Sequence, residues 1–396
     1  MTPPPIERYV GREQAYIKHF LLASYLEPLV HKIGSSYGQI VYVDGFSGPW
    51  ESEGSDYADT SFGIALQALR TARSTWLKHG RDVKMKAVLI EKSKKSHDAL
   101  LTLQPRYPDV DIKPFRADFR TIIDQILGEI PRDAFAFVLI DPKGWRIPIS
   151  TIEPLLRRPN TEVVFNFMFE FINRAASMSS TDIVGGLDEL LPAQGWRAAL
   201  EEVDLRYPER DRPAMRRKIL IDTFRRVLAD QGGYGFVAET PVMRPLKNSM
   251  LYALVYATRS AKGIEVFRDC QIKTLREQET VRGVVKAAKE IEVSKQGSFF
   301  DTTQGLRPDP LVQLLDDERR AAEQYLLSLV PDHGPGVLWK DLWPRILERH
   351  TIRLTELKDV AVRLSKDGVL EFPNLQQGKR KPGEETFLIR TRRESA

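Results

Sequence analysis

Cysteine is nearly absent from this 396-residue sequence, in which Cys270 is the only one. A single cysteine excludes a disulfide within the chain and leaves no cysteine ligand set for a structural zinc ion. The six histidines are scattered without metal-ligand spacing, so we expect no metal site. A chain without disulfides suits a reducing compartment, which predicts a cytoplasmic protein.

Long apolar runs are also missing. The longest fully apolar stretch, residues 134 to 140, is far too short to cross a bilayer, which needs about 20 residues. The first residues, MTPPPIERYV, lack the charged and apolar regions of a signal peptide, so we predict no membrane association. With 42% hydrophobic residues, the chain can form one large domain and a small one.

The sequence does contain a regular alternation of apolar runs and helical stretches. An amphipathic helix is predicted over residues 13 to 33, and several apolar runs follow, each ending in a turn and preceding a helical stretch. Such runs, spaced by helices, favour a parallel sheet covered on both faces. The runs at 235 to 243 and 249 to 260 are too close for a crossover and predict an antiparallel hairpin. We therefore expect an α/β fold with five parallel strands and a closing antiparallel hairpin.

The same pattern suggests three parts. A mostly helical, charged stretch at about 174 to 233 is longer than a crossover needs and predicts a helical insertion, whereas the polar segment 295 to 310 is typical of a linker. We predict a first domain over 1 to 275, a helix and linker over 276 to 316, and a small domain over 317 to 396. In that last domain three helices precede two strands joined by a basic turn.

An acidic residue follows each of four consecutive strands of the predicted sheet: Asp44, Glu91, Asp118 and Asp141. In open α/β sheets, ligands bind outside the carboxyl ends of the strands, so these residues meet where a site would form. Asp44 opens the turn DGFSGPW, whose glycines allow close backbone approach. Taken singly, each acid could be a helix cap and each glycine part of an ordinary turn. Four acids at one edge favour a common binding site.

These segments resemble a known class of enzyme. The order VYVDGFSGPW, AVLIEKS, FRADF and FVLIDPKGW, closed by a strand hairpin, resembles the class I S-adenosylmethionine-dependent methyltransferases. More narrowly, KHFLLASYL, VYVDGFSGPW, DTSFGIAL, VLIDPKGW and VVFNFMFEFINR resemble the three-Cys-motif partner proteins (TcmP), a bacterial methyltransferase-like family. The resemblance covers about residues 13 to 275, and the C-terminal segment is similar to the winged-helix domain that ends such proteins. It implies a Rossmann-like fold, S-adenosylmethionine as cofactor and a three-Cys-motif partner protein.

By position, the resemblance also implies a role for each strand-end segment. The methionine part of the cofactor would be held by Asp44, Gly45, Phe46, Ser47, Gly48 and Pro49. Glu91 would hold the ribose, and Asp118 and Phe119 the adenine. The catalytic segment facing the methyl acceptor would be Asp141, Pro142, Lys143, Gly144 and Trp145.

The last of these segments departs from the Asp-Pro-Pro-aromatic loop of amino-methylating enzymes. Asp141, the first proline and a shifted aromatic are present, whereas Lys143 brings a cation that would repel a protonated amine. Amine methylation is one hypothesis. On the neighbouring strand, Asn166 could reach the substrate cleft.

The C-terminal segment has a basic excess, since Gly334 to Ala396 holds 13 Lys or Arg residues against 9 Asp or Glu. On its third helix, Lys358, Arg363 and Lys366 are predicted to face solvent. Such a helix fits a major groove while Lys379, Arg380 and Lys381 on the basic turn contact phosphates. The alternative is an ordinary solvated face on a protein-binding module. Three consecutive cations between turn residues favour nucleic acid.

Two functions follow from these features. The first is a metal-independent methyltransferase that acts on nucleic acid or on a substrate presented by a partner. The second is a non-catalytic adaptor with a methyltransferase-like domain, which Trp50 favours because it stands where the common first motif of the enzymes has a glycine. No GxxxxGK[ST] loop is present, which argues against an NTPase.

Overall fold

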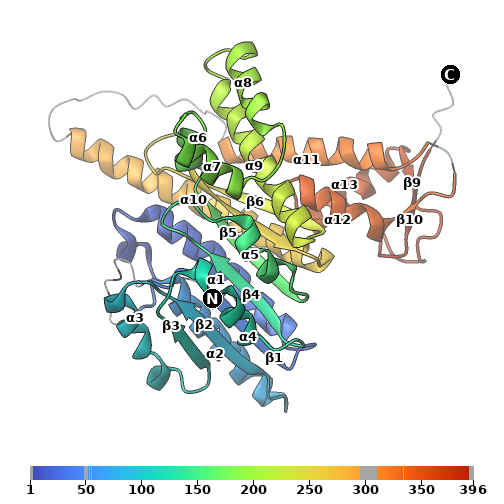
Figure 1. Cartoon of the computed structure of the whole chain (residues 1–396). Helices are drawn as coiled ribbons and strands as arrows, with labels where there is room; N and C mark the ends of the chain where they lie inside the picture. Colours follow the sequence, from blue (N-terminus) through green and yellow to red (C-terminus); the bar gives the residue numbers. More distant parts are fainter. Residues whose placement is uncertain are drawn as a thin grey trace. The chain divides into compact units, whose positions relative to one another are not determined.

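The computed structural model describes residues 3 to 48, 52, 54, 56 to 294, 310 to 332 and 334 to 391 (Figure 1). Pro49, Trp50 and nearly all of the predicted linker lie outside these residues. The chain divides into two compact units, Met1–Arg259 and Ser260–Ala396. The boundary predicted at residue 275 lies inside helix α10 (Ala261–Ser294), which belongs to the second unit. Each unit is described by itself.

The first unit is built on a seven-stranded sheet in the order β3-β2-β1-β4-β5-β7-β6. The strands are β1 (Gln39–Asp44), β2 (Lys84–Ile90), β3 (Asp111–Phe115), β4 (Phe135–Ile140), β5 (Thr161–Phe167), β6 (Phe236–Met243) and β7 (Met250–Thr258). Strands β1 to β5 pair in parallel, and β7 runs antiparallel to both β5 and β6. The large, mostly parallel sheet confirms the predicted α/β class and is consistent with a Rossmann-like methyltransferase fold.

The strand order reverses beside β1. The chain passes from β1 outward to β2 and β3 and then returns to the other side of β1 as β4. The carboxyl ends of β1 and β4 therefore flank the switch point of the sheet, where a crevice opens because successive connections leave in opposite directions. This is the edge at which the sequence predicts a site.

Helices cover both faces of the sheet. On one face, alternate strand residues such as Val43, Val138 and Phe165 join a core with α4 (Ile123–Gly128), α5 (Ile149–Arg157) and α9 (Arg212–Gly232). On the other face lie α1 (Glu13–Ile33) and α2 (Ser61–Lys78). The Tyr25 ring of α1 packs there on Phe137 of β4, with ring centroids 5.9 Å apart. Helix α3 (Lys94–Leu101) connects β2 to β3.

Four helices follow β5, where the sequence predicts a helical insertion. They are α6 (Phe169–Ala175), α7 (Thr181–Leu190), α8 (Trp196–Arg206) and α9, and they gather in the upper part of Figure 1. Buried side chains from α7 and α8, including Leu187 and Trp196, extend the core of the sheet. Among the described helices of the whole chain, none combines the length and apolarity needed to span a membrane.

The second unit contains α10, α11 (Pro310–Leu329), α12 (Trp339–Arg349) and α13 (Leu354–Lys366). A small antiparallel sheet has the order β8-β10-β9, formed by β8 (Val337–Leu338), β10 (Phe387–Arg390) and β9 (Leu370–Glu371). The predicted linker does not reach residue 316, because α11 begins at Pro310. Proline suits the first helical position, where its missing N–H would have had no helical partner.

Candidate functional site

Asp44, the last residue of β1, anchors the turn that follows the strand. Its side chain is completely buried. Its oxygens accept hydrogen bonds from the Phe46 N–H (3.0 Å), the Ser61 hydroxyl (2.7 Å) and the Tyr42 hydroxyl (3.0 Å). Burial raises the pKa of the Asp44 carboxyl, an effect that these donors oppose. Asp44 thus fixes the turn from below, joining it to the first residue of α2.

The turn is also fastened to the two neighbouring strands. The Ser47 hydroxyl, fully buried, accepts from the Ile90 N–H at 3.1 Å, and the Ser47 N–H donates to the Ile90 carbonyl at 2.8 Å. On the other side, the Gly45 N–H donates to the Leu139 carbonyl at 3.0 Å. The backbone donors of Gly45, Phe46 and Ser47 are therefore engaged within the protein. The turn therefore limits the space of the site and offers none of these three N–H groups to a ligand, and Ser47 fixes the turn to β2.

A cavity of about 550 Å³ opens beside this turn at the carboxyl edge of the sheet. The predicted site residues that line it are Gly45, Phe46, Glu91, Asp118, Phe119, Pro142, Lys143, Gly144 and Trp145. Other lining residues were not predicted from the sequence, among them Lys92, Arg120, Arg146 and Phe171. Asp44, Ser47, Gly48 and Asp141 are not part of this lining, and Pro49 is not among the described residues. The fold thus brings together residues that follow β1, β2, β3 and β4.

Glu91 presents a free acceptor to the cavity. The residue follows β2 and is only 4% exposed. One carboxylate oxygen, Oε1, accepts from the Ser93 N–H at 2.6 Å, which holds the side chain in place. In the described part of the chain, no hydrogen bond is made to Oε2. A fixed carboxylate with one open oxygen can accept from a hydroxyl group of a bound ligand.

Asp118, which lines the cavity, is also held by hydrogen bonds from Arg120. Its Oδ1 accepts from the Arg120 N–H (3.1 Å) and Nε (2.9 Å), and its Oδ2 from Arg120 Nη2 (2.7 Å). Lys92 Nζ lies 3.6 Å from the same Oδ2. The hydrogen bonds from Arg120 lower the pKa of Asp118 to about 2. Asp118 therefore caps the short 3-10 helix Phe119–Thr121, the structural alternative that the sequence left open.

Phe119 forms the floor under the β1 turn. The residue is 1% exposed, and its ring centroid lies 5.6 Å from that of Phe46. A side-chain carbon added at Gly45 would stand 3.0 to 3.1 Å from atoms of the Phe119 ring. A larger residue at this position would press on the ring, because the backbone passes close over it. With Ile90 and Ala117, these rings give the cavity an apolar wall.

The segment after β4 forms the opposite side of the cavity. Pro142 is buried, whereas Lys143 is exposed. The Trp145 ring packs against α7, where a side-chain carbon at Gly186 would approach it to 3.0 Å. The Arg146 guanidinium lies 5.3 Å from the Trp145 ring centroid and also pairs with Asp182. Trp145 is therefore held by the helical insertion and walls the cavity.

Asp141 lies beside the cavity lining, in contact with α1 and β5. Its Oδ2 pairs with Lys18 Nζ of α1, and its Oδ1 accepts from Asn166 Nδ2 of β5 at 2.5 Å. The side chains of Lys18 and Asp141 remain 17% and 16% exposed. Sequence reasoning singled out Asp141 and Asn166 but missed Lys18. Nothing local marks Lys18, since the pairing joins residues 123 positions apart.

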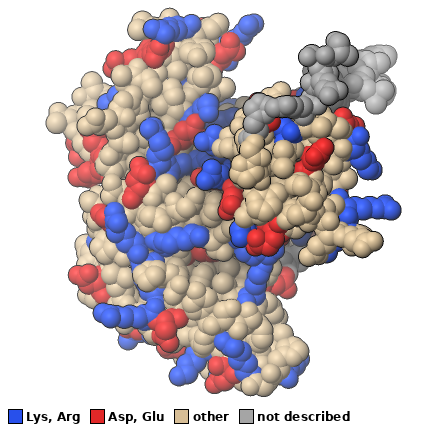
Figure 2. Space-filling model, turned by 90° about the vertical axis from the view of Figure 1, so that its right-hand side faces the viewer, with Lys and Arg blue, Asp and Glu red and all other residues tan. Residues whose placement is uncertain are grey.

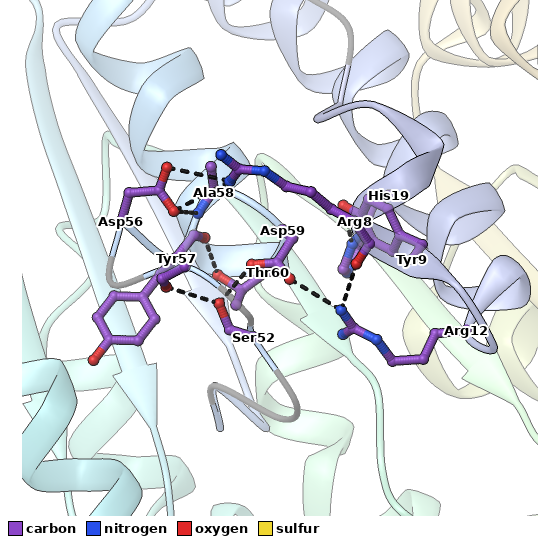
Figure 3. Close-up of polar contacts among 11 residues, drawn as sticks. Arg8, Tyr9, Arg12, His19, Ser52, Asp56, Tyr57, Ala58, Asp59 and Thr60 are labelled. Carbon is purple, nitrogen blue, oxygen red and sulfur yellow. Dashed lines mark hydrogen bonds and ion pairs between the residues drawn. The ribbon is translucent and has the colours of Figure 1, made fainter.

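Figure 3 shows that the N-terminal segment is attached to the loop that leads into α2. Arg12 Nη2 lies 3.1 Å from Oδ2 of Asp59, whose side chain is fully buried, and the Ser52 hydroxyl donates to Asp59 Oδ1 at 2.5 Å. On the surface, Arg8 pairs with Asp56 at 3.3 Å. These contacts bind the residues before α1 to the loop between β1 and α2.

A buried histidine adjoins this network. His19 is 5% exposed, and its Nδ1 shares a hydrogen bond of 3.0 Å with the Tyr9 hydroxyl (Figure 3). Burial lowers the pKa of His19 well below its ordinary value, and the nearby Lys18 and Arg12 cations act in the same direction. The pKa of the Tyr9 hydroxyl is raised, chiefly by burial. His19 is therefore a neutral hydrogen-bonding group that packs α1 against the N-terminal segment.

The basic residues singled out in the second unit differ in their surroundings. Lys381 lies 2.5 Å from Asp359, and Arg363 pairs with Glu323. For Lys358, Lys366, Lys379 and Arg380, the described part of the chain provides no ion pair. In the space-filling view, basic and acidic side chains are interspersed over the face shown (Figure 2). Within the described residues, no group of three His, Cys, Asp or Glu side chains could hold a metal ion.

Comparisons with known proteins give limited similarity. No family profile and no curated protein matches the sequence. A Legionella pneumophila protein of the DUF519 family is 11% identical, with a TM-score of 0.35 over 62% of this chain and 85% of that one. M. jannaschii TYW2, solved with AdoMet, is 11% identical, with a TM-score of 0.29 over 59% and 74%. Loganic acid methyltransferase, solved with SAH, is 7% identical, with a TM-score of 0.28 over 74% and 92%. Likenesses this weak assign no activity to this chain.

Proposed function

We propose that the first unit is an S-adenosylmethionine-dependent methyltransferase whose cofactor occupies the cavity beside the β1 turn. The observation that carries this proposal is the convergence of Gly45, Glu91 and Phe119 on one cavity at the switch point of the sheet. A cavity of about 550 Å³ lies within the range of small-molecule and cofactor sites.

The residues present fit the chemical parts of that cofactor. The open Oε2 of Glu91 suits a ribose hydroxyl, and the apolar wall formed by Ile90, Ala117 and Phe119 suits a purine ring. Gly45, which lines the cavity, would lie beside the methionine part. Asp118 fits less well as an acceptor for the adenine amine, because Arg120 already engages both of its oxygens.

The mechanism requires orientation and hydrogen-bond acceptors. When bound, the cofactor supplies an electrophilic methyl group on a sulfonium. Asp141, beside the cavity, would accept a hydrogen bond from the attacking group and stabilise the positive charge that develops there. Lys18 and Asn166 hold the Asp141 carboxylate in one orientation from two sides. Because these contacts exist before substrate binds, the acceptor is preorganised.

The second unit would deliver a nucleic-acid substrate as a winged helix. Its three helices α11 to α13 and its small antiparallel sheet support this reading. Lys358 and Lys366 on α13, and Lys379 and Arg380 on the turn between β9 and β10, offer cations for phosphate contacts. A three-Cys-motif partner protein, implied by the resemblance to TcmP, is proposed as a further binding partner.

The competing proposal is a non-catalytic adaptor that works through protein or DNA contacts. Calorimetric titration of the full chain with S-adenosylmethionine and S-adenosylhomocysteine separates the two. For the enzyme we expect micromolar dissociation constants, on the order of 7 to 8 kcal/mol of binding free energy. If neither ligand gives a heat of binding, the adaptor is the better account.

A further inference from the structure

Strand β5 carries buried polar residues between its apolar ones. Val163, Phe165 and Phe167 belong to the hydrophobic core on one face, so the alternate residues Glu162 and Asn166 point to the α1 face. Both oxygens of the Glu162 carboxylate have hydrogen-bond partners, because they accept from the hydroxyls of Tyr25 (2.6 Å) and Thr258 (2.8 Å). Asn166, at the carboxyl end of the same strand, is only half satisfied.

The unsatisfied group is the amide oxygen of Asn166. The residue is 4% exposed, and Nδ2 donates to Asp141 at 2.5 Å. Within the described residues, Oδ1 is buried and has no hydrogen-bond partner. An unpaired buried acceptor destabilises the folded chain, so its presence at a strand end beside a proposed site needs an explanation. A bound ligand that supplies the missing donor is such an explanation.

The amide can present only its oxygen. Turning it over would break the hydrogen bond to Asp141 and place Oδ1 against a carboxylate oxygen, so the observed orientation is fixed. Since nitrogen and oxygen share one carbon, the free oxygen lies next to the Asp141 contact. Asp141 and Asn166 therefore form a pair of adjacent hydrogen-bond acceptors at the carboxyl ends of β4 and β5.

The surrounding charge limits which methyl-accepting groups of a substrate can bind beside this pair. Lys18 pairs directly with Asp141 and balances the charge of its carboxylate. The pair therefore has no net negative charge to compensate an ammonium group, which favours an uncharged nucleophile. A hydroxyl has a single hydrogen to donate, whereas an uncharged amino group has two and keeps a lone pair for attack.

We propose that Asn166 is a specificity-determining residue, and that its free oxygen together with Asp141 receives an uncharged, conjugated amino group of the kind carried by nucleobases. This inference rests on the proposed methyltransferase function and deepens it. The amino nitrogen forms a bond to the methyl carbon, while the electron pair of the carbon–sulfur bond passes to sulfur and a neutral thioether leaves. The nitrogen then loses one proton to the Asp141 carboxylate, which passes it to water.

The first test measures binding with two ligands that differ at the methyl position. Sinefungin carries an amino group where the cofactor carries its methyl. At neutral pH this group is protonated, so it mimics the charged sulfonium and can donate a hydrogen bond to an acceptor beside it, whereas S-adenosylhomocysteine carries neither group. In Asn166→Leu we expect sinefungin to bind roughly tenfold more weakly than to the parent, with binding of S-adenosylhomocysteine unchanged. If the leucine variant does not fold, Asn166→Val takes its place. Equal changes for both ligands, or none, would overturn the proposal.

A matched control is available on β6. The Thr240 hydroxyl is likewise completely buried and without a hydrogen-bond partner in the described part of the chain, but it lies two strands from Asn166. Thr240→Val removes this orphaned group without changing the side-chain shape. We expect it to leave the binding of both ligands unchanged. If it weakens sinefungin as Asn166→Leu does, the effect is one of general stability and the proposal fails.

The second test follows transfer of a radiolabelled methyl group to single-stranded homopolymers of adenine, cytosine and thymine nucleotides. Thymine has no exocyclic amino group, so we expect label on adenine or cytosine polymers alone, and at least tenfold less with Asn166→Leu. Label on thymine polymers at a similar level, or on none of the three, contradicts the inference. If the parent chain does not bind S-adenosylhomocysteine, the methyltransferase proposal itself fails.

Discussion

The backbone of Gly45 passes so close over the Phe119 ring that a side-chain carbon at Gly45 would lie 3.0 Å from it. The two residues follow different strands, and both line the cavity. This contact joins the β1 turn to the apolar wall that we assign to the adenine. A side chain at Gly45 would therefore press on one wall of the cavity.

Gly45→Ala should weaken binding of S-adenosylhomocysteine about tenfold, because the added methyl pushes Phe119 into the cavity. The control is Gly38→Ala, just before β1, where a side-chain carbon meets no atom within 4 Å. Calorimetry on both variants gives the comparison. Equal affinities for the two variants would show that the Phe119 ring can move aside without affecting the site.

Glu91→Ala should cost about 1 to 3 kcal/mol of cofactor binding free energy, because the ribose loses a fixed acceptor. Asp118→Ala should cost less, since the Asp118 oxygens are held by Arg120 and not left open to a ligand. Titration of both variants with S-adenosylhomocysteine checks the order. A larger loss for Asp118→Ala would support the adenine contact that the resemblance implies.

His19 should make the stability of the first unit sensitive to mild acid. Its pKa in the folded protein is lowered by burial, so below about pH 6.5 the unfolded chain binds a proton that the folded chain does not. The stabilising contribution is complete above that pH and declines as pH falls, by up to about 1.4 kcal/mol per pH unit.

Urea unfolding of the full chain between pH 5 and 7 measures this effect. In His19→Gln the decline should be shallower, while His79→Gln, at an exposed position after α2, should follow the parent. If the free energy of unfolding depends on pH in the same way in all three proteins, the protonation of His19 does not contribute to the stability change.

Replacing Lys379, Arg380 and Lys381 together by alanine should lower affinity for a short DNA duplex. The log-log salt dependence should flatten by about two units, since each lost phosphate contact releases about one counterion fewer and Lys381 already pairs with Asp359. Fluorescence anisotropy at several salt concentrations measures both quantities. Lys340→Ala, which removes a cation paired with Glu385, serves as the control. An unchanged salt slope would favour a protein-binding role for the second unit.

Local patterns in the sequence were enough to predict most helices and strands and the edge of the sheet at which a site could form. Apolar runs with helical stretches between them predicted the parallel strands, and the acids after β1, β2, β3 and β4 pointed to their common edge. These features follow from local periodicity. A strand that is buried on both faces is almost continuously apolar, so polar residues occur mostly where the strand ends. The residues that line the cavity beside Gly45 were largely among those that the sequence singled out.

The role of each polar group, by contrast, depends on tertiary contacts. Asp44 accepts a hydrogen bond within the turn that follows β1, and Asp118 caps a short helix. Lys18 of α1 pairs with Asp141, although the two residues are far apart in the sequence. The free oxygen of Asn166 was equally invisible, since a half-satisfied amide is defined by the neighbours that it lacks. Hydrogen bonds and ion pairs act over about 3 Å between side chains that any sequence distance can separate, so their partners are set by packing and leave no local pattern.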